Sequence, residues 1–154
     1  MFKQENRIFP EEIQKYGCYF FCLLRICEIE AGKELTEDQV ICLYNDAKFK
    51  RFIGAQCSVE KPDQVCALAM KVLDCKLAVY QVGSYEKGKS YFWGWASKPP
   101  MNDPEYIALK YPTKGEIGHH YVLGNKSMTI LFDPSVTDYT QRPLIGGLWH
   151  KVIG

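Results

Sequence analysis

The first half of the chain carries its apolar positions at helical spacing. Residues 18–31, CYFFCLLRICEIEA, place apolar side chains on a wide face at about 3.6 residues per turn. Gly32 follows directly, and glycine is common just after the C-terminus of a helix. We therefore expect a helix that begins near Cys18, ends at Ala31-Gly32 and is almost wholly buried.

Two more helices are predicted from the residues at their N-termini. Thr36 is a suitable N-cap, acidic residues follow it as the helix dipole favours, and residues 40–44 continue as an apolar stripe. Pro62 and Asp63 are typical of a helix start, and the apolar positions after them extend through Val72. The chain thus begins with a helical half.

After Cys75 the pattern changes to short runs of β-branched and aromatic residues. Residues 76–82, KLAVYQV, read as a strand that ends at Gly83-Ser84. Residues 90–95, SYFWGW, follow the turn-like sequence EKGK and read as a second strand. The three prolines within residues 98–106 predict a loop.

The last third of the chain continues this strand pattern. Residues 119–124, HHYVLG, and residues 128–134, MTILFDP, are short apolar strands separated by a plausible hairpin turn at 125–127. Residues 146–154, GGLWHKVIG, are expected to form a last edge strand. Helices followed by an antiparallel sheet are the segregated pattern of an α+β domain.

Size and composition add few constraints. A chain of 154 residues suits one domain, so we expect a single domain over residues 1–154. A net charge of +1 argues against nucleic acid or an anionic membrane as partner. The N-terminus lacks the apolar core of a secretory signal, and no apolar run is long enough for a membrane span. Seven cysteines, an odd number without a regular spacing, then read as reduced thiols of a cytoplasmic protein.

The candidate chemistry begins with Cys18, which follows Gly17 at the start of the first predicted helix. The unpaired N–H groups and the dipole at a helix N-terminus favour a thiolate, the nucleophilic form of cysteine. Such a nucleophile also needs a base, and the chain has three histidines to supply it. The remaining cysteines are expected to pack in the core, namely Cys22, Cys27, Cys42, Cys57, Cys66 and Cys75.

The base is expected from the pair His119-His120, which opens an apolar strand. Strand alternation puts the two imidazoles on opposite faces, so only one of them faces Cys18. Asp133 ends the next strand, where its carboxylate can orient the imidazole and stabilise its protonated form. His150 is expected instead to cap a surface edge.

The order of these motifs resembles that of papain-like cysteine peptidases. A cysteine leads a buried helix in YGCYFFCLLRI, aromatic and aliphatic residues follow histidine in HHYVL, and a strand ends with Asp-Pro in LFDPS. The nearest likeness is to the bacteriocin-processing, double-glycine-cleaving peptidase family. The resemblance implies a papain-like α+β fold in which N-terminal helices pack on an antiparallel β-sheet.

The resemblance also implies a role for each matched residue. Cys18 takes the place of the nucleophile, Cys22 that of a structural cysteine, and Asp133 that of the acid. His120 is the base if the aromatic and aliphatic residues after it set the register, and His119 is the base if the preceding glycine does.

A glutamine before the nucleophile donates to the oxyanion in such enzymes, and Gln14 is its counterpart, beside the backbone N–H of Cys18. Tyr19 and Phe21 stand where the family has small residues. The expected activity is cleavage of a peptide or related amide bond, without cofactor or metal. An acyltransferase or a deamidase can use the same three catalytic groups.

Two other readings remain open. Cys18, Cys22 and the two adjacent histidines are possible zinc ligands, although adjacent strand histidines point to opposite faces. The second reading is a catalytically silent papain-like binding module that presents the aromatic hairpin around Trp93 and Trp95 to a ligand. Aromatic residues in such runs are more often strand core.

Overall fold

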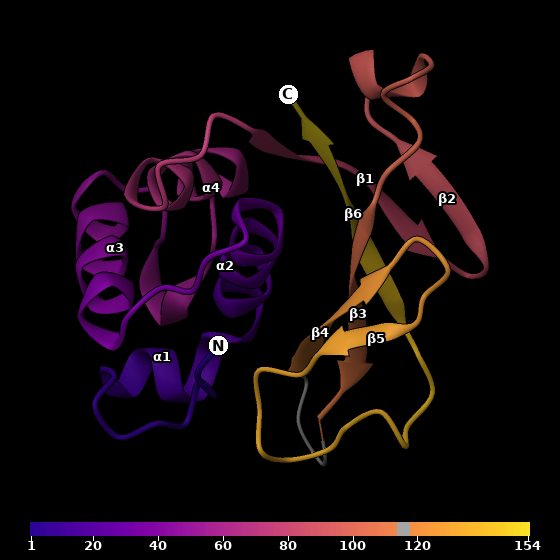
Figure 1. Ribbon diagram of the computed structural model, residues 1–154. Helices are drawn as coiled ribbons and strands as arrows, with labels where there is room; N and C mark the ends of the chain where they lie inside the picture. The colour runs from indigo at the N-terminus through magenta and orange to yellow at the C-terminus, as the bar shows by residue number, and fades with distance from the viewer. Residues whose placement is uncertain (114–117) are drawn as a thin grey trace.

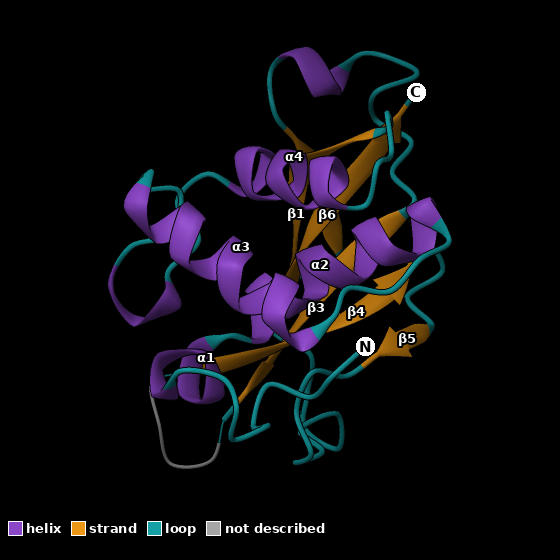
Figure 2. Ribbon diagram, turned by 60° about the vertical axis from the view of Figure 1, so that its left-hand side comes forward, coloured by secondary structure: helices purple, strands orange, loops and turns teal. Residues whose placement is uncertain are grey.

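A computed structural model describes residues 1–113 and 118–154. Helices form one layer and a six-stranded antiparallel sheet forms the other, as Figures 1 and 2 show from two directions. The chain therefore has the α+β architecture that its pattern predicts. The α-helices of the described residues are α1 (Glu11–Tyr16), α2 (Cys18–Ala31), α3 (Glu37–Phe49) and α4 (Pro62–Val72).

The helix boundaries follow the local signals in the sequence. Gly32 ends α2 in the left-handed region, at φ 66°, and its N–H donates to the carbonyls at the end of the helix. Thr36 caps α3 in a reciprocal pair with Gln39, and Pro62 opens α4. These three predictions are confirmed. The short helix α1 was not predicted.

The six strands fall in the second half of the chain and take the spatial order β2-β1-β6-β3-β4-β5. The strands are β1 (Ala78–Glu86), β2 (Lys89–Phe92), β3 (Tyr106–Pro112), β4 (His119–Asn125), β5 (Ile130–Phe132) and β6 (Gly146–Ile153). Between β2 and β3 the chain forms a short 3₁₀ turn, η2 (Trp95–Ser97). The β4–β5 hairpin confirms the predicted pairing of HHYVLG with the strand that precedes Asp133.

Three strand predictions are corrected. The last strand, β6, is not an edge strand, because it lies between β1 and β3. The central strand β3 directly follows the predicted loop and was missed. Strand β1 does not stop at Gly83 but continues past it, with a bulge between Gln81 and Gly83. A Cβ on Gly83 would lie 2.3 Å from the Tyr91 carbonyl oxygen, so glycine here permits the close approach of β2.

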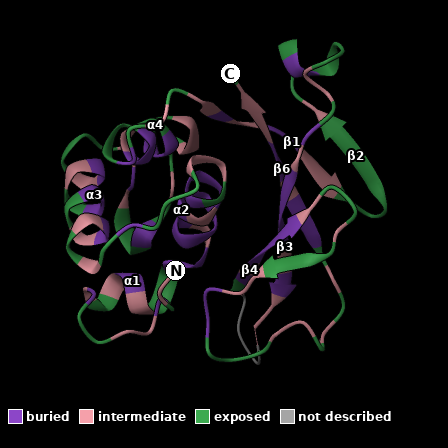
Figure 3. Ribbon diagram, in the orientation of Figure 1, coloured by how far each residue is buried: buried purple, intermediate pink, exposed green. Residues whose placement is uncertain are grey.

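The core lies mainly between the helices and the sheet, and α2 is its centre. Figure 3 shows α2 as largely buried, and Phe20, Phe21, Leu23 and Leu24 are fully buried on it. A smaller apolar cluster on the opposite face of the sheet contains Ile107, Leu109, Val122 and Trp149. Within the described residues, no helix combines the length and apolarity needed to traverse a bilayer.

Two core predictions are wrong in part. Cys22, Cys27, Cys57 and Cys66 are buried as expected, Cys75 is half-buried, and Cys42 is exposed on α3. The aromatic residues Tyr91, Trp93 and Trp95 are not strand core, because they are 51%, 38% and 52% exposed.

Candidate active site

The candidate nucleophile is the first residue of α2. Gly17 joins α1 to α2, and a Cβ on Gly17 would lie 2.5 Å from the Ile13 carbonyl oxygen. Glycine therefore lets the chain pass from one helix into the next without a spacer. Because Gly17 has no side chain that could cap α2, the N–H groups of the first turn of α2 remain as donors beside Cys18. The Cys18 residue is 8% exposed.

The structure brings His120 and Asp133 together. His120 lies at the start of β4, and Asp133 follows β5, which pairs with β4 so that Phe132 lies opposite Leu123. The hairpin thus carries the carboxylate to the imidazole, and His120 Nε2 lies 2.8 Å from Asp133 Oδ1. The imidazole is almost fully buried, with 4% of its surface exposed, so solvent screens this contact weakly.

The charge state of His120 is set by these neighbours. Burial alone lowers the pKa of His120, but hydrogen bonds from its imidazole to Asp133 and to Cys18, with the charges of both groups, raise it to about 9. Asp133 is the partner of Nε2, so Nδ1 is the ring nitrogen left for another partner. An imidazole in this environment is protonated at neutral pH.

A strap at the N-terminus, residues Lys3–Glu5, holds the turn that carries Asp133. Lys3 Nζ donates to the Asp133 carbonyl oxygen at 2.5 Å, and the Gln4 N–H donates to the Pro134 carbonyl oxygen at 2.8 Å. Ser135 Oγ donates to the Glu5 carboxylate at 2.5 Å, and the Ser135 N–H donates to Asp133 Oδ1 at 3.0 Å. Sequence reasoning missed this strap, since nothing in its composition links it to a turn 130 residues away.

His119, the alternative base, lies apart from this pair. It is exposed, and its ring packs edge-on against Tyr121 at 5.6 Å between centroids. Partial burial and the charge of Lys110 lower the pKa of His119. The two adjacent histidines therefore differ as strand alternation predicts, and the buried one contacts the acid.

Gln14 is only partly available for the oxyanion role. The side-chain Nε2 of Gln14 donates to the Phe9 carbonyl oxygen at 2.8 Å. The backbone carbonyl oxygen of Gln14 accepts from Gln4 Nε2 at 3.1 Å. A carboxamide nitrogen carries two hydrogens, so one N–H of Gln14 is left for a ligand. The backbone N–H of Cys18 is the other candidate donor.

His150 does not cap a surface edge, contrary to expectation. It is fully buried on β6, and its Nε2 lies 2.7 Å from the Tyr19 hydroxyl, which in turn accepts from Gln81 Nε2 at 2.7 Å. Burial lowers the pKa of His150 to about 3. The missed signal is the position of β6, because a central strand buries a residue that an edge strand would expose.

The described ranges 1–113 and 118–154 contain no group of three or more His, Cys, Asp or Glu side chains placed to hold a metal ion. The four residues considered as zinc ligands are therefore not arranged as such a group. His120 is directed at Asp133, and Cys22 is buried in the core.

Comparisons with known proteins add the family alone. No curated protein matches the chain, and no solved structure matches it. A family model described as "Protein of unknown function, DUF261" matches residues 1–142, a span that contains Cys18, His120 and Asp133 and ends before β6. The chain belongs to this family, DUF261.

Proposed function

We propose that this protein is a papain-like cysteine peptidase or amidase that cleaves a peptide or related amide bond. The nucleophile is Cys18, the base is His120 and the orienting acid is Asp133. One observation carries the proposal: a buried imidazole lies between a carboxylate, 2.8 Å from its Nε2, and the thiol that begins the central helix. A purely structural histidine needs no partner of this kind on both sides.

The fold assignment within the proposal is supported by the arrangement of the elements. A helix led by cysteine packs on an antiparallel sheet, and the histidine on β4 and the acid just after β5 follow in the order that the family resemblance implies. Because a fold hosts many functions, the catalytic part of the proposal depends on the three side chains and not on the architecture.

The raised pKa of His120 gives the resting state of the proposed site. An imidazole with a pKa of about 9 holds a proton at neutral pH, and the proton of the Cys18 thiol is the one it takes up. The resulting imidazolium stabilises a thiolate beside it, and the N–H groups at the start of α2 stabilise it further.

The reaction then follows from the positions of these groups. Cys18 Sγ attacks the carbonyl carbon, and the electron pair of the C=O bond moves to oxygen, where the Cys18 N–H and the free N–H of Gln14 donate. The tetrahedral intermediate collapses as His120 gives its proton to the leaving nitrogen and the C–N bond breaks. Water, deprotonated by His120, then cleaves the thioester and releases a carboxylic acid and the thiol. An amine in place of water would make the same site an acyltransferase.

Competitive alkylation tests the proposal, because the chain supplies its own control. Cys42 is exposed on α3, whereas Cys18 is 8% exposed. Ordinary thiols are alkylated in order of exposure, so Cys42 should react first in a protein without an activated thiol. We expect iodoacetamide at pH 7 to modify Cys18 at least tenfold faster than Cys42, as measured by peptide mass spectrometry.

The variant His120→Gln separates activation from exposure. It should slow the alkylation of Cys18 by about tenfold or more, because the thiolate loses its counter-ion, and leave the rate at Cys42 unchanged. Circular dichroism checks that the variant is folded. A Cys18 that reacts more slowly than Cys42, or at a rate that does not depend on His120, would overturn the catalytic proposal.

A second candidate function rests on the exposed aromatic residues on β2 and in the segment that follows it. Tyr91, Trp93 and Trp95 lie on the surface although nearly all large apolar side chains of α2 are buried. Such rings favour a catalytically silent module that binds a ligand by stacking. This function predicts ligand-dependent quenching of tryptophan fluorescence that survives Cys18→Ser and is lost in Trp93→Ala.

A further inference from the structure

A cavity lies between α4 and residues 75–80, in a part of the molecule that the thiol site does not use. Its volume is about 440 Å³, within the range of pockets that bind small ligands. None of the residues that line it is Cys18, His120 or Asp133. Gln64 and Ala67, on the α4 wall, are exposed, so the cavity is open to solvent.

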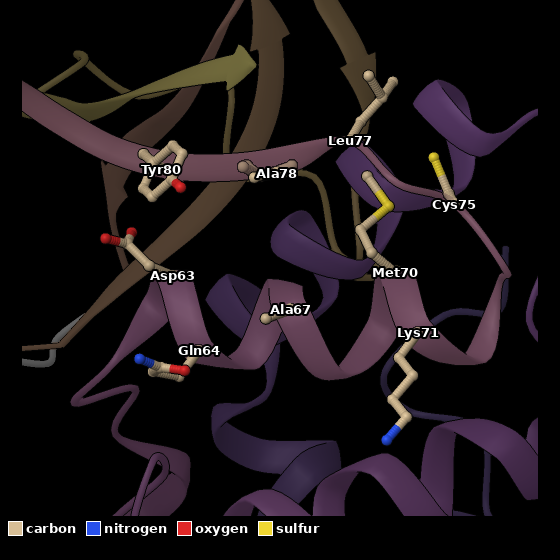
Figure 4. A pocket seen from close by; sticks show the side chains of 10 residues that line it. Asp63, Gln64, Ala67, Met70, Lys71, Cys75, Leu77, Ala78 and Tyr80 are labelled. Carbon is tan, nitrogen blue, oxygen red and sulfur yellow. The ribbon is translucent and has the colours of Figure 1, made fainter. Parts of the chain in front are cut away.

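The two ends of the cavity differ in chemistry. Figure 4 shows Asp63 of α4 and Tyr80 of β1 together at one end, and Met70 and Leu77 toward the other. The hydrogen bond from the Gln81 N–H to Asp63 Oδ1, at 2.8 Å, supports this placement, because Gln81 directly follows Tyr80. A ligand therefore meets a carboxylate and an aromatic ring at one end and apolar side chains at the other.

Asp63 brings a negative charge that its protein partners do not neutralise. Its partner, the Gln81 N–H, is a neutral donor and takes up one carboxylate oxygen. Among the residues that the structure describes, Asp63 makes no salt bridge. Asp63 is half-buried, and burial raises the pKa of its carboxyl group. A cation beside the carboxylate would oppose this effect, because it stabilises the charged form.

Lys71 also lines the cavity, but it does not compensate the charge of Asp63. It lies eight positions after Asp63 on α4, about 12 Å at the helical rise. In Figure 4 the side chain of Lys71 points away from β1. The charged group that faces the space between the helix and the strand is therefore Asp63, and this space favours a cation over an anion.

The aromatic ring beside Asp63 is a second feature that favours a cation. Tyr80 is half-buried, and its ring packs edge-on against Trp95, with 5.6 Å between centroids and 86° between planes. Trp95 is 52% exposed, so the aromatic surface continues from the cavity wall toward solvent. Because the faces of aromatic rings carry partial negative charge, they attract cations.

We propose that this cavity binds an alkylammonium ion, with its charged head between Asp63 and Tyr80 and its alkyl chain toward Met70 and Leu77. An ammonium N–H donates to the Asp63 carboxylate oxygen that the Gln81 N–H does not occupy. The alkyl chain removes the apolar wall from water. The inference goes beyond the proposed function and does not depend on the chemistry of Cys18.

Three ligands with the same alkyl chain and different heads test the proposal. Hexylammonium, hexanol and hexanoate carry a positive charge, no charge and a negative charge at pH 7. Titration of the ¹⁵N-labelled full chain, followed by NMR, measures each affinity and shows which amides shift. We expect hexylammonium to bind about tenfold more tightly than hexanol, and hexanoate to bind most weakly. The largest shifts should fall in α4 and residues 75–81.

The variant Asp63→Asn tests the charge, and the chain offers a matched control. An asparagine keeps an oxygen that can accept from the Gln81 N–H but carries no charge. It should weaken the binding of hexylammonium about tenfold, to the affinity of hexanol. Asp38 is likewise the second residue of its helix, α3, and does not line the cavity. Asp38→Asn should therefore leave binding unchanged.

A second pair of variants tests the aromatic ring. Tyr80→Leu keeps an apolar side chain but removes the ring, and should weaken the binding of hexylammonium about fivefold. Tyr80→Phe keeps the ring and should leave binding unchanged. Circular dichroism checks the fold of each variant. Because Asp63 and Tyr80 lie on different walls, a folding defect in one variant leaves the other as a test.

Four results would overturn the proposal. The first is the absence of shifts in α4 and residues 75–81 at millimolar hexylammonium. The second is binding of hexanol as tight as that of hexylammonium. The third is a preference for hexylammonium that survives Asp63→Asn. The fourth is tighter binding of hexanoate, since it would make Lys71 the charged group that the ligand contacts.

Discussion

Two buried histidines on one sheet have opposite charge states. His120 on β4 and His150 on β6 are 4% and 0% exposed, so both are shielded from water. The pKa of His120 is raised to about 9, whereas that of His150 is lowered to about 3. Burial acts on both in the same direction, since it disfavours the charged form. The difference must therefore come from their partners.

The partner of His120 is a carboxylate, and the partner of His150 is a hydroxyl. Asp133 stabilises an imidazolium, while Tyr19 can satisfy a neutral imidazole without supplying charge. The same fold thus holds one imidazole protonated at neutral pH and keeps the other as an uncharged core residue. The histidine that we propose as the base is distinguished from the other by the acid across the hairpin and not by its depth in the protein.

The largest expected effect concerns His150 and the stability of the protein in acid. The folded-state pKa of about 3 lies below the ordinary value of 6.5, so the unfolded chain binds a proton that the folded chain excludes. The contribution of a neutral His150 is fully present above pH 6.5 and is lost as the pH falls from 6.5 toward 3. The slope from this group is about 1.4 kcal/mol per pH unit.

Urea unfolding at pH 7, 6, 5 and 4 measures this slope. In His150→Gln the contribution of His150 to this slope should vanish. The free energy of unfolding should therefore fall less steeply as the pH decreases over the same range. The variant loses some stability at pH 7, which does not affect a comparison of slopes. Equal slopes in the two proteins would show that His150 takes up a proton in the folded state.

The next effect concerns Asp133, the carboxylate that His120 contacts and His150 lacks, and its influence on the pKa of His120. In Asp133→Asn the pKa of His120 should fall from about 9, because the hydrogen bond and charge of Asp133 are lost while burial and the Cys18 contact remain. The titration of the His120 ring signal in an NMR spectrum of histidine-labelled protein measures it. Exposed His119 provides a control in the same spectrum. A midpoint that stays near 9 would mean that the Cys18 thiolate, and not Asp133, holds the proton on the imidazole.

Local signals in the sequence were enough for the features that depend on neighbours along the chain. The start of α2 at Cys18, its end at Gly32 and the cap at Thr36 all follow from residues within one helical turn. The pairing of one histidine of the 119–120 pair with Asp133 also follows from the short hairpin, but strand alternation alone left open which of the two it is.

Features that depend on the order of strands in space were not predictable in this way. The sequence of β6 reads equally well as an edge or a central strand, and only its place between β1 and β3 buries His150. The strand β3 was missed because it directly follows a loop rich in proline.

The smallest effect tests how firmly the Asp133 turn must be held for His120 to differ from His150. Ser135 Oγ donates to Glu5 at 2.5 Å and accepts from the Thr137 N–H at 3.0 Å, so Ser135→Ala removes two bonds that fix the turn. We expect a loss of about 1 kcal/mol in unfolding free energy and a decrease of about fivefold in the alkylation rate of Cys18. Thr140→Ala breaks a similar hydroxyl-to-carboxylate bond, to Asp138, in the neighbouring turn and should leave that rate unchanged. If both variants slow Cys18 equally, the whole loop and not the strap at Asp133 controls the imidazole.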